Sequence, residues 1–193
     1  MQRIILASQS PRRRQLLEWA EQPLTVIVSD TDESYPAGLG IADTAVHIAR
    51  NKALAVQKVC KGMADHKGST PVLAADTIVV LGDTIIGKPK DRADAIGILS
   101  ALSGQLHQVI TGVMILNDEK EIAFADTTAV QFHELSQVQI EFYVDKYKPY
   151  DKAGAYAIQE WIGVIGIRSI AGDFYNVMGL PVSRVMQVLA KEF

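Results

Sequence analysis

IILASQSPRRR, residues 4–14, is the stretch that decides how the first part of the chain folds. Its first four residues are apolar and predict a short buried strand over residues 4–7. Ser10 is a favourable N-cap residue and Pro11 suits the first helical position, so a helix should follow the strand after a tight loop. The body of that helix is expected over residues 14–20.

The same stretch is also the first candidate site. Arg12 and Arg13 fall in the first helical turn, where the helix dipole disfavours cations. A bound phosphate would resolve this conflict, because the Ser8 and Ser10 hydroxyls, the backbone N–H groups and the guanidinium groups would converge on one anion. The alternative is an exposed basic turn with an ordinary cap. The position directly after a buried strand favours phosphate binding.

Strands and helices are mixed along the rest of the chain. Apolar or alternating runs predict strands at residues 24–28, 72–75, 77–81, 108–116, 122–132 and 162–170. Periodic or capped segments predict helices at residues 43–60, 91–102, 136–144 and 181–191. Gly82-Asp83 and residues 117–120 are turn signals between neighbouring strands. The pattern indicates an α/β fold, a mixed sheet with helices packed on it, without repeats or a linker.

The composition excludes several classes of protein. The chain has 193 residues, 48% of them hydrophobic and 21% charged, and a net charge of −3. A nucleic-acid-coating protein would carry a large basic excess, so no nucleic-acid partner is expected. Cys60 is the only cysteine, which excludes an intrachain disulfide and a cysteine-based metal cage. No apolar run reaches the roughly 18 residues of a membrane span, and the N-terminal basic residues follow the apolar stretch, the wrong order for a secretory signal. We therefore expect a cytoplasmic protein with no membrane partner.

A lysine falls on the apolar side of the helix predicted over residues 43–60. On a helical wheel the apolar stripe holds Ala45, Ile48, Ala49, Ala53, Val56, Val59 and Cys60. Lys52 is the only charged residue within that stripe. Its amine would either extend past the core to water or meet a buried carboxylate or phosphate, because an unpaired buried charge is costly. His47 lies on the polar side, where solvation explains it.

Acidic residues follow two of the predicted strands. Asp76 stands between two apolar strand segments, so its carboxylate should be paired, bind a metal or have a perturbed pKa. Asp30, Asp32 and Glu33 cluster after the second strand, and an acidic loop alone would simply be solvated. Combined with Asp76 and the phosphate-binding stretch, they favour a Mg²⁺ or Mn²⁺ site, which takes carboxylate oxygens and keeps positions for water and substrate phosphates.

Other polar residues are less decisive. Lys88 is a rigidly placed lysine between Gly87 and Pro89, before a predicted helix. Asp151 lies at a turn, where a structural cap is a serious alternative to a functional role, and Asn176 is more often a turn-former than a ligand. The histidines show no metal-ligand spacing: His47, His66, His107 and His133.

Together these segments resemble the Maf family of nucleotide pyrophosphatases. The matching pieces follow the family's order along nearly the whole chain: residues 6–13, 32–33, 52–53, 75–77, 87–89, 103–113, 151–159 and 176–181. No single piece is decisive, but their order and spacing are jointly specific. The resemblance implies a two-lobed α/β fold of the Maf and ITPase kind, in which helices flank a long mixed sheet and the substrate lies in a central cleft. Residues 1–193 would form one such domain with two intimate lobes, often as a homodimer.

The family's chemistry is metal-dependent cleavage between the α- and β-phosphates of a nucleoside triphosphate, giving the monophosphate and pyrophosphate. By resemblance, Asp76 would accept a proton from the attacking water, and Glu33 would help it to hold Mg²⁺ or Mn²⁺. The triphosphate would be bound by Ser8, Ser10, Arg13, Lys52 and Lys88.

The resemblance extends to one branch of the family, which acts on dTTP and UTP. The positions that select the base in that branch match Arg12, Thr77 and Gln159, and all three are residue types that the branch uses. One departure is Tyr147-Lys148-Pro149, where the family usually has Gly-Glu-Pro. If that glutamate helps to place the metal or the neighbouring lysine, Lys148 alters the local arrangement.

Two other functions compete with hydrolysis. An acidic pair at a strand end and a Lys-Pro step would also suit a nucleotidyltransferase, which would need an acceptor before it released pyrophosphate. A nucleotide-binding regulator, the third alternative, would bind tightly without turnover. The placement of Asp76 with the phosphate donors favours the hydrolase, whose substrate would be a normal or a modified pyrimidine nucleotide.

Overall fold

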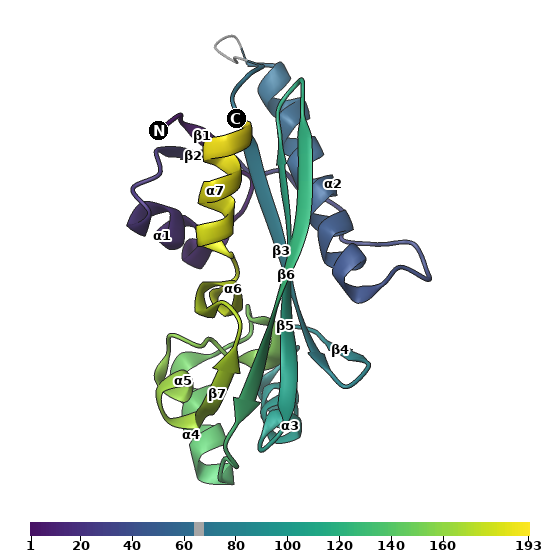
Figure 1. Ribbon diagram of the computed structural model, residues 1–193. Coiled ribbons are helices and arrows are strands. Elements are labelled where there is room, and N and C mark those ends of the chain that lie inside the picture. Colours follow the sequence, from purple (N-terminus) through teal and green to yellow (C-terminus); the bar gives the residue numbers. More distant parts are fainter. Residues whose placement is uncertain (64–67) are drawn as a thin grey trace. The chain divides into compact units, whose positions relative to one another are not determined.

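The computed structural model describes residues 1–63 and 68–193. Strands in these residues are β1 (Ile4–Leu6), β2 (Leu24–Val26), β3 (Val72–Leu81), β4 (Thr84–Ile86), β5 (Leu106–Leu116), β6 (Glu121–Phe132) and β7 (Ile167–Ala171) (Figure 1). The helices are α1 (Pro11–Trp19), α2 (Ile41–Lys61), α3 (Arg92–Leu102), α4 (Gln137–Tyr147), α5 (Trp161–Gly166), α6 (Phe174–Met178), α7 (Val182–Glu192) and the short 3₁₀ helix η1 (Ala153–Ala155). None of the helices described is both long and apolar enough to cross a membrane.

The strands form a mixed sheet, which confirms the predicted α/β fold. Their order is β2-β1-β3-β5-β6-β7, and β4 pairs with β3. β1 runs parallel to β2 and to β3, whereas the β3–β4 and β6–β7 pairs are antiparallel. Parallel neighbours need a crossover connection, and α1 and α2 supply it for β1, β2 and β3. The predicted hairpin turn is confirmed, because Leu81 pairs with Thr84 across Gly82, whose φ is +59°.

The chain divides into two compact units. One comprises Met1–Asp76, Thr111–Asp126 and Gly179–Phe193, and the other comprises Thr77–Ile110 and Thr127–Met178. Strands β3, β5 and β6 contribute residues to both units. The prediction that residues 1–193 form one domain with two intimate lobes stays a prediction.

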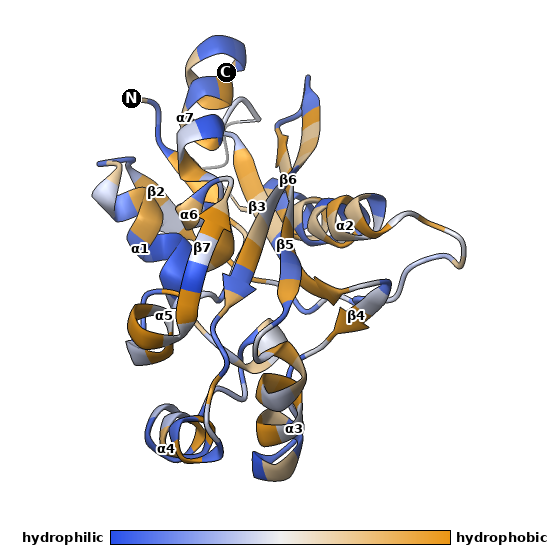
Figure 2. Cartoon of the chain, turned by 60° about the horizontal axis from the view of Figure 1, so that its bottom comes forward, coloured by the Kyte–Doolittle hydropathy of each residue, from blue (hydrophilic) through white to orange (hydrophobic). Residues whose placement is uncertain are grey.

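In the first unit, α2 covers one face of the strands. Its buried residues pack in a core with alternate residues of β1, β3 and β5: Ile5, Ala7, Ala49, Ala53, Val56, Cys60, Val72, Ala74, Met114 and Leu116. Figure 1 shows α1 and α7 on the opposite side of β3 from α2, and their buried residues Leu16, Leu17 and Val185 are at most 1% exposed. Figure 2 shows hydrophobic residues along much of β3, as expected for a strand covered on both faces. One stripe residue was assigned wrongly, because Val59 is 41% exposed near the end of α2.

The second unit is built around α3 and an aromatic cluster. α3 packs against α4 and η1, and α5 packs against β7. The rings of His107, Phe132 and Tyr156 meet edge to face, and His107 Nε2 lies 2.8 Å from the Tyr156 hydroxyl. Burial lowers the pKa of His107 to about 4 and raises that of Tyr156, so both groups are neutral near pH 7.

Two local predictions in this unit are wrong. Residues 162–170 are not one strand: the chain is helical in α5 and becomes strand only in β7. A short apolar run does not distinguish a buried strand from a buried helix segment. Here the Glu160 carbonyl accepts hydrogen bonds from Gly163 N at 2.9 Å and Val164 N at 3.3 Å, which starts a helical turn. Asn176 is not a turn-former either, because it lies fully buried in α6 and its Nδ2 donates to Val109 O and to Thr128 Oγ1 at 3.0 Å.

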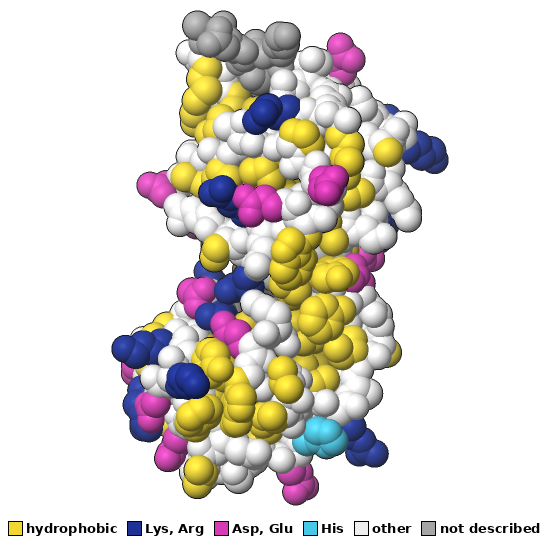
Figure 3. All heavy atoms as spheres, turned by 90° about the vertical axis from the view of Figure 1, so that its left-hand side faces the viewer, with side chains coloured by type: hydrophobic (Ala, Val, Ile, Leu, Met, Phe, Trp, Pro, Cys, Tyr) yellow, Lys and Arg dark blue, Asp and Glu magenta, His cyan; other side chains and the backbone are white. Residues whose placement is uncertain are grey.

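The surface carries charges of both signs. Figure 3 shows Lys and Arg side chains interspersed with Asp and Glu on the face it presents, among hydrophobic side chains. Several of the surface charges pair, as Arg14 does with Glu18 at 2.7 Å and Arg92 with Asp145 at 2.6 Å. Exposed pairs of this kind contribute little to the stability of a fold, because water and salt screen the two charges.

The contact between α2 and β5 depends on a glycine. A Cβ added at Gly112 would lie 2.3 Å from the Ala45 carbonyl carbon and from Val46 N. We expect Gly112→Ala to lower the free energy of unfolding by roughly 2 kcal/mol or more, because the backbones of α2 and β5 are too close here to admit a methyl group. Gly97→Ala is the control, since a Cβ at this exposed position of α3 meets nothing within 4 Å. Denaturant titration should show the loss for Gly112→Ala alone, and equal midpoints for both variants would contradict this account.

Candidate active site

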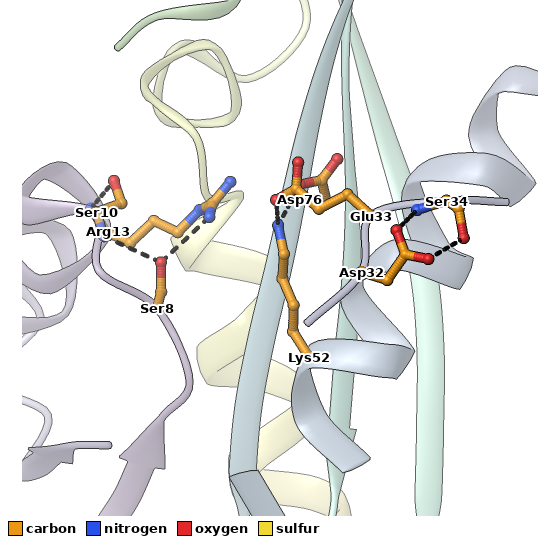
Figure 4. Close-up of polar contacts among 8 residues, drawn as sticks. All are labelled: Ser8, Ser10, Arg13, Asp32, Glu33, Ser34, Lys52 and Asp76. Atoms are coloured by element: carbon orange, nitrogen blue, oxygen red, sulfur yellow. Dashed lines mark hydrogen bonds and ion pairs between the residues drawn. The ribbon is translucent and has the colours of Figure 1, made fainter. Parts of the chain in front are cut away.

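The segment after β1 is held by its own side chains (Figure 4). Ser10 caps α1, because its hydroxyl accepts from Arg13 N at 3.4 Å, and Pro11 is the first helical residue. The Ser8 hydroxyl accepts from Ser10 N at 3.2 Å and from Arg13 Nη1 at 3.2 Å. These contacts confirm the predicted cap and place the Ser8 hydroxyl beside the Arg13 guanidinium.

Arg13 is fixed by a distant part of the same unit. Its Nε donates to the carbonyl oxygen of Gly179 at 2.7 Å, and the side chain is half-buried. Burial lowers the pKa of Arg13 below its ordinary value, while the negative charges of Asp76 and Glu33 oppose that shift. In Figure 4 the guanidinium group points toward Asp76. Arg13 therefore brings a positive charge into the surroundings of these two carboxylates.

Lys52 lies between the same two carboxylates. Its Nζ is 2.7 Å from Asp76 Oδ1 and 2.7 Å from Glu33 Oε1. The Lys52 and Asp76 side chains are 19% and 16% exposed, whereas that of Glu33 is 54% exposed. Of the two alternatives for this lysine, the structure supports the one in which its amine meets a buried carboxylate. Such charge-assisted contacts are stronger than neutral hydrogen bonds and compensate for burying the charge.

The alternation of β3 explains why Asp76 faces Lys52. Val72 and Ala74 pack against α2, so Asp76 points to the same side of the strand. The residues around it are nearly all buried, with Ala75 0% and Ile78 7% exposed. Asp76 is thus the point at which an apolar strand face becomes polar.

Only one member of the acidic loop joins this cluster. Asp32 Oδ1 and Oδ2 accept from Ser34 N at 2.9 Å and from Ser34 Oγ at 2.6 Å. These hydrogen bonds lower the pKa of Asp32, whose carboxylate is turned away from Lys52 in Figure 4. Asp30 is exposed. Glu33 is the residue that reaches Lys52, and nothing in the acidic pattern alone singled it out.

The carboxylates suit a divalent cation that phosphates also bind. Glu33 and Asp76 both direct an oxygen at one cationic group, the Lys52 ammonium. Mg²⁺ is usually held by one or two carboxylates while water and substrate phosphates complete its shell. Among the described residues no group of three or more His, Cys, Asp and Glu side chains is arranged to hold a metal. The residues therefore fit a metal that the two carboxylates hold only in part and whose remaining ligands come from water and the substrate phosphates. The Mg²⁺ or Mn²⁺ assignment stays a prediction.

The remaining predicted site residues divide between the two units. Arg12 is half-buried next to Arg13, and its charge contributes to lowering the Arg13 pKa. Thr77 follows Asp76 directly in β3 but belongs to the second unit, as do the exposed residues Lys88 and Gln159. Their placement relative to the carboxylates stays a prediction.

The sequence pattern alone does not identify a buried lysine in the second unit. Lys152 is 8% exposed, and its Nζ lies 2.8 Å from Asp151 Oδ1 and 3.6 Å from Glu160 Oε1. Asp151 therefore pairs with its own neighbour. A lysine in a turn normally reaches solvent, so only the family motif at residues 151–154 hinted that this one is special.

The sequence matches the Maf family, described as "Maf-like protein", over residues 3–192. A protein of Parabacteroides distasonis named "dTTP/UTP pyrophosphatase" is 48% identical over 188 residues, which cover 97% of this chain and 94% of the relative. A protein of the same name from Cytophaga hutchinsonii is 46% identical, covering 98% of this chain and 84% of the relative. A third protein of this name, from Bacillus cytotoxicus, is 44% identical over 193 residues, and the match covers 100% of this chain and 96% of the relative. On this likeness along nearly its whole length, the chain belongs to the Maf family.

Proposed function

We propose that this protein is a nucleoside triphosphate pyrophosphatase that hydrolyses dTTP and UTP to the monophosphate and pyrophosphate. The observation that carries the proposal is the Lys52 ammonium, 2.7 Å from both Asp76 and Glu33, with the Arg13 guanidinium pointing toward Asp76 (Figure 4). The three relatives named "dTTP/UTP pyrophosphatase", which are 44% to 48% identical to this chain, support this activity.

Asp76 is the group that activates water. Phosphoryl transfer requires positioning and charge neutralisation more than covalent chemistry, so one ionised carboxylate suffices to align the water and take its proton. The Lys52 ammonium, 2.7 Å from Asp76 Oδ1, holds this carboxylate in place. The water oxygen then bonds to the α-phosphorus while the bond to the pyrophosphate leaving group breaks.

The charges of the cluster bear on how the triphosphate is bound. Lys52 and Arg13 carry two positive charges, and Asp76 and Glu33 carry two negative ones, so the four groups are neutral together. Further positive charge must therefore balance the phosphates. We assign it to Arg12, to Lys88 and to a Mg²⁺ or Mn²⁺ ion that Glu33 and Asp76 would hold, whose chemistry is charge neutralisation at the phosphate oxygens. The Ser8 and Ser10 hydroxyls and the N-terminus of α1 add neutral donors.

The base is selected by Arg12, Thr77 and Gln159. The imide edge of thymine or uracil presents an acceptor, a donor and an acceptor in order. The Gln159 amide carries one donor and one acceptor, so it can pair with a carbonyl and the imide N–H. Arg12 and Thr77 offer donors that suit carbonyl oxygens better than the exocyclic amine of cytosine.

Two assays distinguish this function from its rivals. A screen of nucleoside triphosphates, normal and modified, for pyrophosphate release with Mg²⁺ or Mn²⁺ tests hydrolysis, and release without an added acceptor contradicts a nucleotidyltransferase. Tight nucleotide binding with no turnover under excess metal would favour a regulator. A cytoplasmic location, a homodimer and the lack of a nucleic-acid partner stay predictions from the sequence.

Asp76→Asn should lower kcat by at least about 100-fold, because the amide cannot accept the proton of water. The fold should persist, since Lys52 keeps Glu33 as a partner. Asp32→Asn is the matched control, because Asp32 bonds to Ser34 outside the cluster. Steady-state assays with dTTP and thermal melts check both variants, and wild-type kcat in Asp76→Asn would sink the assignment.

Lys52→Met should leave α2 folded, because its stripe is otherwise apolar and accepts an unbranched side chain, but it should lower the melting temperature somewhat, because the Asp76 carboxylate loses its ammonium partner. It should lower kcat/KM for dTTP by about 30-fold, equivalent to losing roughly 2 kcal/mol of charge-assisted contact. Lys58→Met, on the exposed side of the same helix, provides the comparison. A sharp drop in melting temperature with full activity per folded molecule would instead make Lys52 a structural residue.

The enzyme should prefer dTTP and UTP over CTP and over purine triphosphates. CTP would set donor against donor at Gln159, and sites built on hydrogen bonds reject such mismatches by far more than they reject a missing methyl group. Because a missing methyl group has a much smaller effect, the kcat/KM values for dTTP and UTP should differ only modestly. Values of kcat/KM for dTTP, UTP, CTP and GTP test this, and an equal or higher value for CTP or GTP would refute it.

A further inference from the structure

A buried tyrosine holds the chain on both sides of Gln159. Tyr143 in α4 is 0% exposed, and its hydroxyl donates a hydrogen bond to Glu160 Oε2. The same hydroxyl accepts from Ala157 N at 3.1 Å. Ala157 and Glu160 flank the dipeptide Ile158-Gln159, so one hydroxyl group binds both ends of the turn that carries Gln159.

The turn is constrained from within as well. Glu160 N donates to Ala157 O at 3.1 Å, which closes the turn, and the Glu160 carbonyl accepts from Gly163 N at 2.9 Å at the start of α5. A Cβ at Gly163 would lie 1.7 Å from Ile158 O, so only glycine lets α5 approach Ile158 this closely. Gln159 itself is exposed, although its neighbour Ile158 is 4% exposed. The backbone is thus fixed while the amide side chain stays accessible.

Lys152 completes the network. Its buried ammonium lies 3.6 Å from Glu160 Oε1 and 2.8 Å from Asp151 Oδ1. Glu160 therefore has one carboxylate oxygen near a positive charge and the other bonded to Tyr143. Tyr147 stacks on the Tyr143 ring with centroids 5.0 Å apart. This stacking supports the ring that carries the hydroxyl group.

We infer that Tyr143, Glu160 and Lys152 are positioning residues for base recognition, because they fix the turn that presents Gln159. The inference rests on the proposed function and deepens it. A glutamine on a loose turn can shift its whole side chain to accommodate cytosine as well as uracil, whereas a fixed turn sets the Cα position and direction from which the amide donor and acceptor reach the base. The network thus acts on the choice of base. It does not act on the phosphate chemistry, which all nucleoside triphosphates share.

The test compares Tyr143→Phe with Tyr147→Phe. Tyr143→Phe keeps the buried ring and removes the hydroxyl group, whereas Tyr147→Phe removes a hydroxyl group from the same helix and keeps the stacking. We expect Tyr143→Phe to lower the ratio of kcat/KM for dTTP to that for CTP by roughly tenfold, mainly through the KM for dTTP. The value for CTP should stay near that of the wild type, and Tyr147→Phe should change neither.

A second variant and a second measurement keep the outcome decisive. Glu160→Gln retains an acceptor for Tyr143 but removes one of the two negative charges near Lys152, so it should lower the same ratio by a smaller factor even if Tyr143→Phe folds poorly. Amide hydrogen exchange over residues 157–160, measured without nucleotide, should speed up in Tyr143→Phe and stay unchanged in Tyr147→Phe.

The results distinguish a failure of the positioning role from a failure of the proposed function. Unchanged selectivity and exchange in both Tyr143→Phe and Glu160→Gln, beside lost selectivity in Gln159→Ala, would overturn the positioning role and leave the proposed function intact. Unchanged selectivity in Gln159→Ala would overturn base recognition by Gln159 and the positioning role with it. Absence of pyrophosphate release from every triphosphate by the wild-type protein would overturn the proposed function itself.

Discussion

The pairing of one ammonium group with two carboxylates is the interaction on which the first unit depends. Lys52 interrupts the apolar stripe of α2, and Asp76 interrupts the apolar face of β3 that packs on it. Either charge alone would be costly at this interface, because removing one partner of a buried pair leaves an uncompensated charge. At 2.7 Å the two charges satisfy each other, and they hold helix and strand in one register. The charges that serve the proposed chemistry are therefore also part of the packing.

This double role explains why the core of the site could be predicted from the sequence. A charged residue within an apolar pattern can be recognised without a structure. Lys52 stands out in this way on the helical wheel, and Asp76 stands out between two apolar strand segments. The Ser10 cap and the strand before it could be predicted for a similar reason, because caps and buried strands follow local rules. Glu33 is different, since the acidic loop offered three equivalent residues and only the family resemblance selected one.

What could not be predicted involves partners that are distant in the chain. The apolar run of residues 162–170 lacks a distinguishing period and predicts one strand, and only the pairing of β7 with β6 shows where the strand begins. Asn176 resembles a turn residue until Val109 and Thr128 are seen beside it. Local patterns do not encode such contacts, so tertiary structure overrides propensity at these positions.

Phosphate binding and base selection place different demands on the protein. Attraction between charges falls off gradually with distance, so a cluster such as Lys52, Arg13 and the carboxylates tolerates small displacements. It also cannot discriminate, because every nucleoside triphosphate carries the same phosphates. Hydrogen bonds weaken steeply with angle, so discrimination requires a donor and an acceptor whose direction is fixed. In the proposed base recognition, an exposed glutamine would meet that demand better on a fixed backbone, and in the second unit the buried Tyr143 hydroxyl bonds to both ends of the turn that carries Gln159.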